Sequence, residues 1–286
     1  MRSGLAVALL VSFAFAQAAD ATILINEMLI NHSSSATAAD QDREFIELRS
    51  TTGGIETMTG LHYIYIEGDG NNSGVVDFAF DLSALSTGTN GLAVLTDGLL
   101  AWDPAADPAT PVTAVEFTND DGGGDDLENG SSTHLIVAGY TGTPGVDLDT
   151  DNDGTLDSMP WTSVISAVGW KESSTGTENT YAAALGGIEF DGNVLGSDPD
   201  AFIAAPDGNF VIDSFTTDDD TLDDGPWGIG GGGALDDSNN VVVPNPAFTL
   251  TPGSANTLNV AIPEPTSMAL GAFGLGALLI RRRLAD

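Results

Sequence analysis

Short apolar runs separated by turn residues constrain this chain more than any other feature of its sequence. Between residues 21 and 258, no segment sustains the 3.6-residue apolar period of an amphipathic helix. The runs are bounded instead by Gly, Asn, Asp, Ser and Pro, a pattern typical of strands in β-sandwiches and barrels. They fall at residues 21–30, 44–50, 62–68, 75–80, 91–97, 114–117, 134–140, 164–170, 201–206, 209–213 and 241–244.

The alternation within these runs also predicts which side chains share a face. In an extended strand, Tyr63 and Tyr65 point to one side, and Ile64 and Ile66 point to the other. Glycine at 35 positions and proline at 13 suit a protein rich in loops. Between residues 21 and 258 helix is expected to be scarce, with a single turn at 181–185. We therefore expect an all-β fold, an antiparallel sandwich or barrel with long acidic loops.

The first 18 residues have the pattern of a secretory signal peptide. Arg2 precedes an apolar run from Gly4 to Phe15, which is followed by the small-x-small sequence at 16–18. Cleavage is expected after Ala18, with Ala21 as the alternative. The segment 1–18 is therefore expected to be an N-terminal signal helix, and the protein is expected to be exported across the inner membrane.

The far end of the chain has a second apolar segment. The uncharged stretch 266–280 follows a Pro-Glu-Pro sequence and precedes three arginines. As a helix it would be roughly 22 Å long, short of the ~30 Å hydrocarbon core of a bilayer. The arginines would stay on the cytoplasmic side by the positive-inside rule. By its chemistry alone, this short hydrophobic helix would hold the chain only weakly and transiently at the inner membrane.

In the order of its parts, the segment 262–286 resembles the PEP-CTERM sorting signal. That resemblance implies processing by an exosortase near the Pro-Glu-Pro sequence. It also implies release of the protein to the cell surface or to an extracellular, exopolysaccharide-containing matrix, whose components would be its partners. The residues that carry the resemblance are Pro263, Glu264, Pro265, Arg281, Arg282 and Arg283.

Acidic residues outnumber lysine and arginine by 42 to 7, for a formal net charge of −35. Between residues 19 and 262 only Arg43, Arg49 and Lys171 are basic. Without Glu264 and Asp286, 40 of the 42 acids remain there, so this part has a net charge near −37. Such a surface repels phosphate backbones, which excludes nucleic-acid binding through a basic patch. It attracts cations, although simple solubility outside the cell explains the charge equally well.

Four pieces of the body resemble the lamin-tail domain. They are Asn26-Glu27, the Glu-aromatic-Ile-Glu-Leu sequence at 44–48, the strand at 164–170 and the Thr-Pro-Gly-x-x-Asn sequence at 251–256. Residues 58–61 stand where that family has a Leu-Ser-Gly-Trp turn. The resemblance implies an immunoglobulin-like β-sandwich over 22–258 with an enlarged middle region at 71–160. It also implies attachment or interaction rather than catalysis. From the residues themselves, Glu27 and Glu47 are expected to have structural roles.

One acidic loop has the spacing of a calcium site. Carboxylates at alternate positions are followed by Gly154, which allows the sharp bend that turns their oxygens toward one hard cation. Pro160 stands where a complete EF-hand has a bidentate Glu, so we expect weak affinity, around 10⁻⁴–10⁻³ M. A solvated acidic turn remains the alternative. The predicted ligands are Asp149, Asp151, Asp153, Asp157 and the backbone carbonyl of Thr155.

The sequence contains no recognisable catalytic motif. The chain has no cysteine, which excludes disulfides, thiol nucleophiles and thiolate metal sites. Its histidines, His32, His62 and His134, have no metal-site spacing, and there is no G-x-S-x-G sequence. We therefore expect a non-enzymatic module with no catalytic or cofactor-binding residues. Two alternatives stay open: a polysaccharide-binding module using exposed tryptophans, and a hydrolase of matrix polymers using two close carboxylates.

Overall fold

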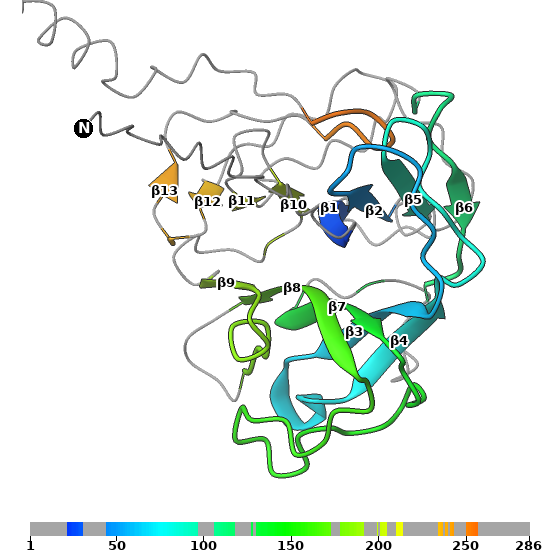
Figure 1. The fold of residues 1–286 in the computed structure, drawn as a ribbon. Coiled ribbons are helices and arrows are strands. Elements are labelled where there is room, and N and C mark those ends of the chain that lie inside the picture. The colour runs from blue at the N-terminus through cyan, green and yellow to red at the C-terminus, as the bar shows by residue number, and fades with distance from the viewer. Residues whose placement is uncertain are drawn as a thin grey trace, which may run out of the picture.

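The computed structural model is built from two β-sheets packed face to face, with almost no helix (Figure 1). Because the sheets stack, the apolar face of each is covered by the other. The structure describes residues 22–30, 44–96, 106–117, 127, 130–172, 178–191, 199, 201–204, 210–213, 234–236, 238–239, 241–242 and 250–256. The predicted signal peptide and sorting segment lie outside these residues. Within them, no helix has the length and apolar character needed to cross a membrane.

Thirteen strands and one short 3₁₀-helix make up the regular structure of the described residues. The first half of the chain contributes β1 (Ile23–Leu29), β2 (Phe45–Ser50), β3 (Leu61–Glu67), η1 (Gly70–Asn72), β4 (Val76–Asp81), β5 (Leu92–Thr96), β6 (Val112–Ala114) and β7 (Ser132–Ala138). The second half contributes β8 (Ser163–Lys171), β9 (Ile188–Asp191), β10 (Ala201–Ala204), β11 (Phe210–Asp213), β12 (Ala234–Asp236) and β13 (Val241–Val242).

The strand order is β13-β12-β11-β10-β1-β2-β5-β6 in the eight-stranded sheet and β4-β3-β7-β8-β9 in the five-stranded sheet. Most neighbours are antiparallel, as expected, but β6 runs parallel to β5 and β9 runs parallel to β8. The expectation of a purely antiparallel fold is therefore wrong at one edge of each sheet. The segments 97–111 and 172–187 make this possible, because a parallel pair needs a connection of about a dozen residues or more.

The main core lies between the two sheets. Ile25 and Ile46 from the eight-stranded sheet pack there with Tyr63, Tyr65 and Trp170 from the five-stranded sheet. All five side chains are buried, so Trp170 packs in the core and is not on a binding surface. The middle region 71–160 contributes β4 and β7 to one sheet and β5 and β6 to the other.

The five-stranded sheet is buried on its second face as well. Ile64 and Ile66 of β3 point away from the main core and form a smaller cluster with Leu148 and Tyr181, against which Trp161 packs. The expected alternation of tyrosine and isoleucine along β3 is therefore confirmed. Leu148 and Trp161 belong to the long loop between β7 and β8, so this loop forms part of the fold. The predicted single turn at 181–185 is also present, closed by the Leu185 amide on the Tyr181 carbonyl at 3.1 Å.

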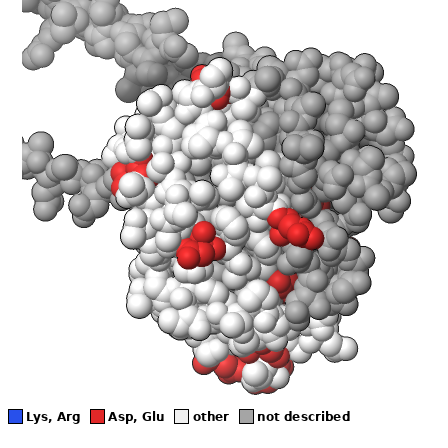
Figure 2. All heavy atoms as spheres, turned by 90° about the vertical axis from the view of Figure 1, so that its right-hand side faces the viewer, with Lys and Arg blue, Asp and Glu red and all other residues white. Residues whose placement is uncertain are grey.

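Acidic side chains are spread over the face of the molecule seen in Figure 2. One group lies at its lower end, where Figure 1 places the β7–β8 loop. No lysine or arginine of the described residues shows on this face. On this face, the described residues therefore show negative charges without visible positive ones.

Candidate metal centre

The acidic loop that the sequence singles out is anchored beside β4 on its N-terminal side and closed on itself on its C-terminal side. On its N-terminal side, Val75 and Asp147 form a β-bridge, and the Leu148 amide donates to the Gly74 carbonyl at 2.9 Å. On its C-terminal side, the Asp157 amide donates to the Leu148 carbonyl at 2.7 Å. Leu148 itself is buried in the outer cluster. The loop is therefore closed at its base, and the exposed carboxylates of Asp151 and Asp153 lie at its tip.

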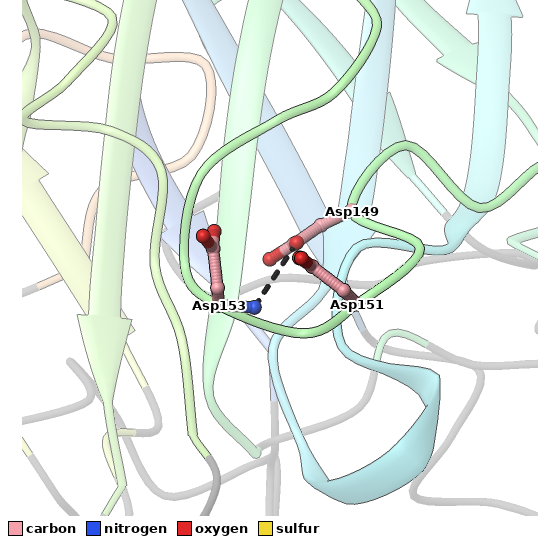
Figure 3. Close-up of side chains that lie close together, drawn as sticks. All are labelled: Asp149, Asp151 and Asp153. Carbon is pink, nitrogen blue, oxygen red and sulfur yellow. Dashed lines mark hydrogen bonds between the residues drawn. The ribbon is translucent and has the colours of Figure 1, made fainter.

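Two left-handed residues curl the chain between these anchors. Asn152 has φ 54° and Gly154 has φ 83°, in the region that Asn and Gly tolerate best. The turn is completed by the Asp149 carboxylate, which accepts the amides of Asp153 at 3.2 Å and Gly154 at 2.9 Å. As a result, one carboxylate oxygen from each of Asp149, Asp151 and Asp153 lies within 4.8 Å of the other two (Figure 3).

The negative charges of these carboxylates repel one another, and this repulsion makes Asp151 a weaker acid. The pKa of Asp151 is raised above its ordinary value, chiefly by the charge of Asp153, with smaller contributions from burial, Asp157 and Asp149. Asp151 and Asp153 are exposed, whereas Asp149 is buried. A bound cation would relieve this repulsion, and clustered carboxylate oxygens are the ligands that Ca²⁺ prefers. The three residues therefore fit a calcium ion.

The other two predicted ligands make different contacts. Asp157 accepts hydrogen bonds from the Thr150 amide, at 3.0 Å, and from the Thr150 hydroxyl. These bonds lower the pKa of Asp157 and hold its carboxylate against the loop backbone. Thr155 donates its amide to Asp153 at 2.8 Å. The carbonyl of Pro160, at the position of the EF-hand glutamate, accepts the Thr141 amide at 2.8 Å.

Sequence reasoning missed the residues that support the loop from outside. The Tyr181 hydroxyl lies 2.9 Å from an Asp149 carboxylate oxygen, to which it donates, and 3.0 Å from the Ser73 hydroxyl. Asn179 donates to the Asn152 carbonyl at 3.2 Å and to Ser73 at 3.0 Å. Burial is the main cause that raises the pKa of Tyr181, so this hydroxyl stays a hydrogen-bond donor. No spacing in the sequence links these residues to the loop.

His134 and the tryptophans within the described residues do not form an accessible site, whereas His62 is half-buried and lies 3.9 Å from Asp81. His134 is buried, 2.6 Å from the Tyr63 hydroxyl and 3.0 Å from the Ser132 hydroxyl, and its ring stacks on Trp170. Burial lowers the pKa of His134 to about 3, so the ring is neutral at ordinary pH. Trp161 is half-buried against the outer cluster. His32, Trp102 and Trp227 lie outside the described residues, as do the predicted sorting residues.

A second polar constellation lies on the outer side of the eight-stranded sheet. Asn26 and Glu27 of β1 meet Glu47 of β2 there, beneath the segment 250–256. The structure thus brings together three of the four sequence pieces that resemble the lamin-tail domain. Glu27 and Glu47 are both fully buried.

No family model matches this chain, and no curated protein is similar to it.

Proposed function

We propose that this protein is an exported, non-enzymatic β-sandwich module of the cell surface or extracellular matrix, stabilised by calcium at Asp149, Asp151 and Asp153. The observation that carries the proposal is the convergence of these three carboxylates at the tip of an anchored loop. The missing twelfth-position glutamate and the hydrogen-bonded Asp157 favour weak binding, of the order of 10⁻⁴–10⁻³ M, as in extracellular modules.

The buried acids and the buried histidine of the described residues favour a role other than catalysis. The buried acid pair Glu27 and Glu47 lies beneath the segment 250–256, where a polymer substrate has no access. The ring nitrogens of His134 contact Tyr63 and Ser132 within the core. The half-buried Trp161 and the buried Trp170 do not favour a sugar-binding platform.

We also propose that the sandwich is an enlarged lamin-tail domain of immunoglobulin-like type. Support comes from the meeting of Asn26-Glu27, Glu47 and the segment 251–256 in one cluster of hydrogen bonds. If these distant sequence pieces form the conserved core of one domain type, their side chains and backbone are expected to contact one another in the fold. The resemblance to lamin-tail domains implies attachment or interaction, which agrees with a role in the matrix.

Calcium binding to the full-length chain tests the proposed site directly. Isothermal titration is expected to give saturable binding of one ion, and the double variant Asp151→Asn with Asp153→Asn is expected to abolish it. The matched control is Asp107→Asn with Glu116→Gln, which removes two exposed charges elsewhere and should bind calcium like the unchanged chain. Equal calcium binding by the two double variants would contradict the proposed site.

Export and processing can be tested in a host that carries an exosortase. The full-length chain is expected outside the cell without its last residues, as measured by mass spectrometry of the released protein. Replacing Arg281, Arg282 and Arg283 by serine should leave the protein unprocessed in the inner-membrane fraction, whereas Arg43→Ser should change nothing. Release of the arginine variant with the same processed end would contradict the sorting assignment.

A further inference from the structure

A β-bulge places an unusual pair of acids side by side. Between β1 and β2 the register shifts at Asn26, so that Ile25 pairs with Leu48 and Glu27 pairs with Glu47. Because Asn26 is the extra residue, its side chain and that of Glu27 can both face outward from the main core. Glu27 and Glu47 are therefore directly opposite each other on neighbouring strands, and both are 0% exposed.

The segment Thr251–Asn256, called here the C-terminal strap, closes over this pair. The Thr251 amide donates to a Glu27 carboxylate oxygen at 2.6 Å, and the Gly253 amide donates to Glu47 at 2.7 Å. Asn256 donates to the Ala204 carbonyl of β10 at 2.8 Å. Two of the strap's hydrogen bonds thus depend directly on carboxylate oxygens.

A short turn at 106–110 holds the strap from its other side. The Thr110 hydroxyl donates to the Gly253 carbonyl at 2.7 Å, and the Asp107 amide donates to the same carbonyl at 3.1 Å. Gly253 has φ +77°, and a Cβ there would lie 2.4 Å from the Cβ of Ala106. The strap is therefore packed as well as hydrogen-bonded.

The two carboxylates have unequal partners. Glu47 accepts hydrogen bonds from the Asn26 side chain and the Gly253 amide, and Arg49 lies close enough to favour its charge. The second oxygen of Glu27, Oε2, is buried and has no hydrogen-bond partner. A buried acceptor without a partner is costly, and a charged one next to another carboxylate is more costly still. A proton on Oε2 of Glu27 removes that charge and leaves Oε1 free to accept the Thr251 amide.

We propose that the C-terminal strap is a proton-controlled latch, closed while Glu27 holds a proton opposite Glu47 and opened when both carboxylates are ionised. The latch does not depend on the proposed calcium site. It would control how firmly the end of the folded body is held, seven residues before the Pro-Glu-Pro sequence that begins at Pro263. An open strap would also uncover the two carboxylates.

The charged groups around the pair agree with this assignment. Arg49 of β2 is the only basic residue that acts on the pair within the described residues, and it acts on Glu47. The neighbouring strands place Ile203 of β10 opposite Glu27 and Val94 of β5 opposite Glu47, and neither residue titrates. The strap contains no titratable side chain, and the turn at 106–110 contributes only Asp107.

The direction of the pH dependence follows from burial. Burial raises the pKa of Glu47 to about 8, and burial together with the charge of Glu47 raises the pKa of Glu27 well above 4.5. The strap's hydrogen bonds from Thr251 and Gly253 lower these two pKa values, but burial has the larger effect on both. The folded, closed state therefore binds protons more tightly than the open one. Strap closure is fully stabilised below about pH 4.5 and is progressively lost as the pH rises through about 8.

Hydrogen exchange of the strap amides in the full-length chain tests the latch. Protection of the Thr251 and Gly253 amides, relative to the core amide of Ile64 and corrected for intrinsic exchange, is expected to fall about tenfold or more between pH 6 and pH 9. In Glu27→Gln the side-chain carbonyl still accepts the Thr251 amide, but position 27 cannot ionise and the two opposed charges can no longer form together, so the protection of the Thr251 amide should not change with pH. Glu116→Gln, which removes an exposed charge, should behave like the unchanged chain.

Strap protection that follows Ile64 at every pH would overturn the latch, and so would an equal loss of protection in Glu27→Gln. A second measurement does not need the variant to fold. The carboxyl carbons of Glu27 and Glu47 in the unchanged chain, followed by NMR, should titrate well above 4.5. Titration of both near 4.5 would contradict the proposal.

Discussion

At the scale of single residues, backbone conformation brings the three carboxylates of the proposed calcium site together. Gly154 is predictable from the sequence, since the alternating aspartates need a sharp bend directly after them. Asn152, with φ 54°, and Gly74, with φ 95°, are not predictable, because nothing in their neighbourhood marks a left-handed residue. Gly74 lies against the loop, so that a Cβ there would lie 2.6 Å from the Cβ of Asp149 and 2.9 Å from its amide nitrogen.

Substitution of Gly74 by alanine is therefore expected to displace the proposed calcium-binding loop. Placing alanine in a left-handed conformation costs about 1–2 kcal/mol, and the clash with Asp149 should add about 1–3 kcal/mol to the loss of unfolding free energy. Calcium affinity should fall as well. Denaturant unfolding and calcium titration of the full-length chain measure the two effects.

Gly60 is a matched control for this substitution. It has φ +76°, but a Cβ at that position has no heavy atom within 4 Å. Gly60→Ala should therefore show the backbone cost alone, with unchanged calcium affinity. Equal effects of the two substitutions on stability and on calcium binding would show that Gly74 does not position the loop.

At the scale of elements, strands were predictable where their own side chains alternate. The segment 62–68 is an example, since β3 separates its tyrosines into the main core and its isoleucines into the outer cluster. The parallel pairings of β6 and β9 were not predictable, because alternation describes the faces of a strand but not its neighbour or its direction. The 3₁₀-helix η1 at Gly70–Asn72 has no apolar period and was missed for that reason.

The long-range contacts of the strap illustrate the same limit. From the sequence alone, Glu47 is expected only to have a structural role. In the structure its partners are Asn26 and the amide of Gly253. A partner 206 positions away cannot be found from local periodicity. Glu27 and Glu47 accept the strap amides, so the structural role expected for them is the one that the latch proposal describes.

At the scale of the whole molecule, the dominant property is negative charge, −35 in total, with acidic side chains on the face shown in Figure 2. Any salt screens such a surface, so a general stabilisation by added ions is expected. A specific site differs because it stabilises the fold in proportion to its own occupancy. Composition alone could not separate these two effects, whereas the convergence of Asp149, Asp151 and Asp153 makes them separable by experiment.

The most direct measurement is the melting temperature of the full-length chain in calcium and in sodium chloride of equal ionic strength. For a Kd of about 10⁻⁴–10⁻³ M, calcium at about 10 mM should stabilise the fold by roughly 1.4–2.7 kcal/mol. This corresponds to a rise of roughly 3–10 °C beyond that in sodium chloride, which the variant Asp151→Asn with Asp153→Asn should lose. Equal melting temperatures in the two salts would contradict a calcium-stabilised module.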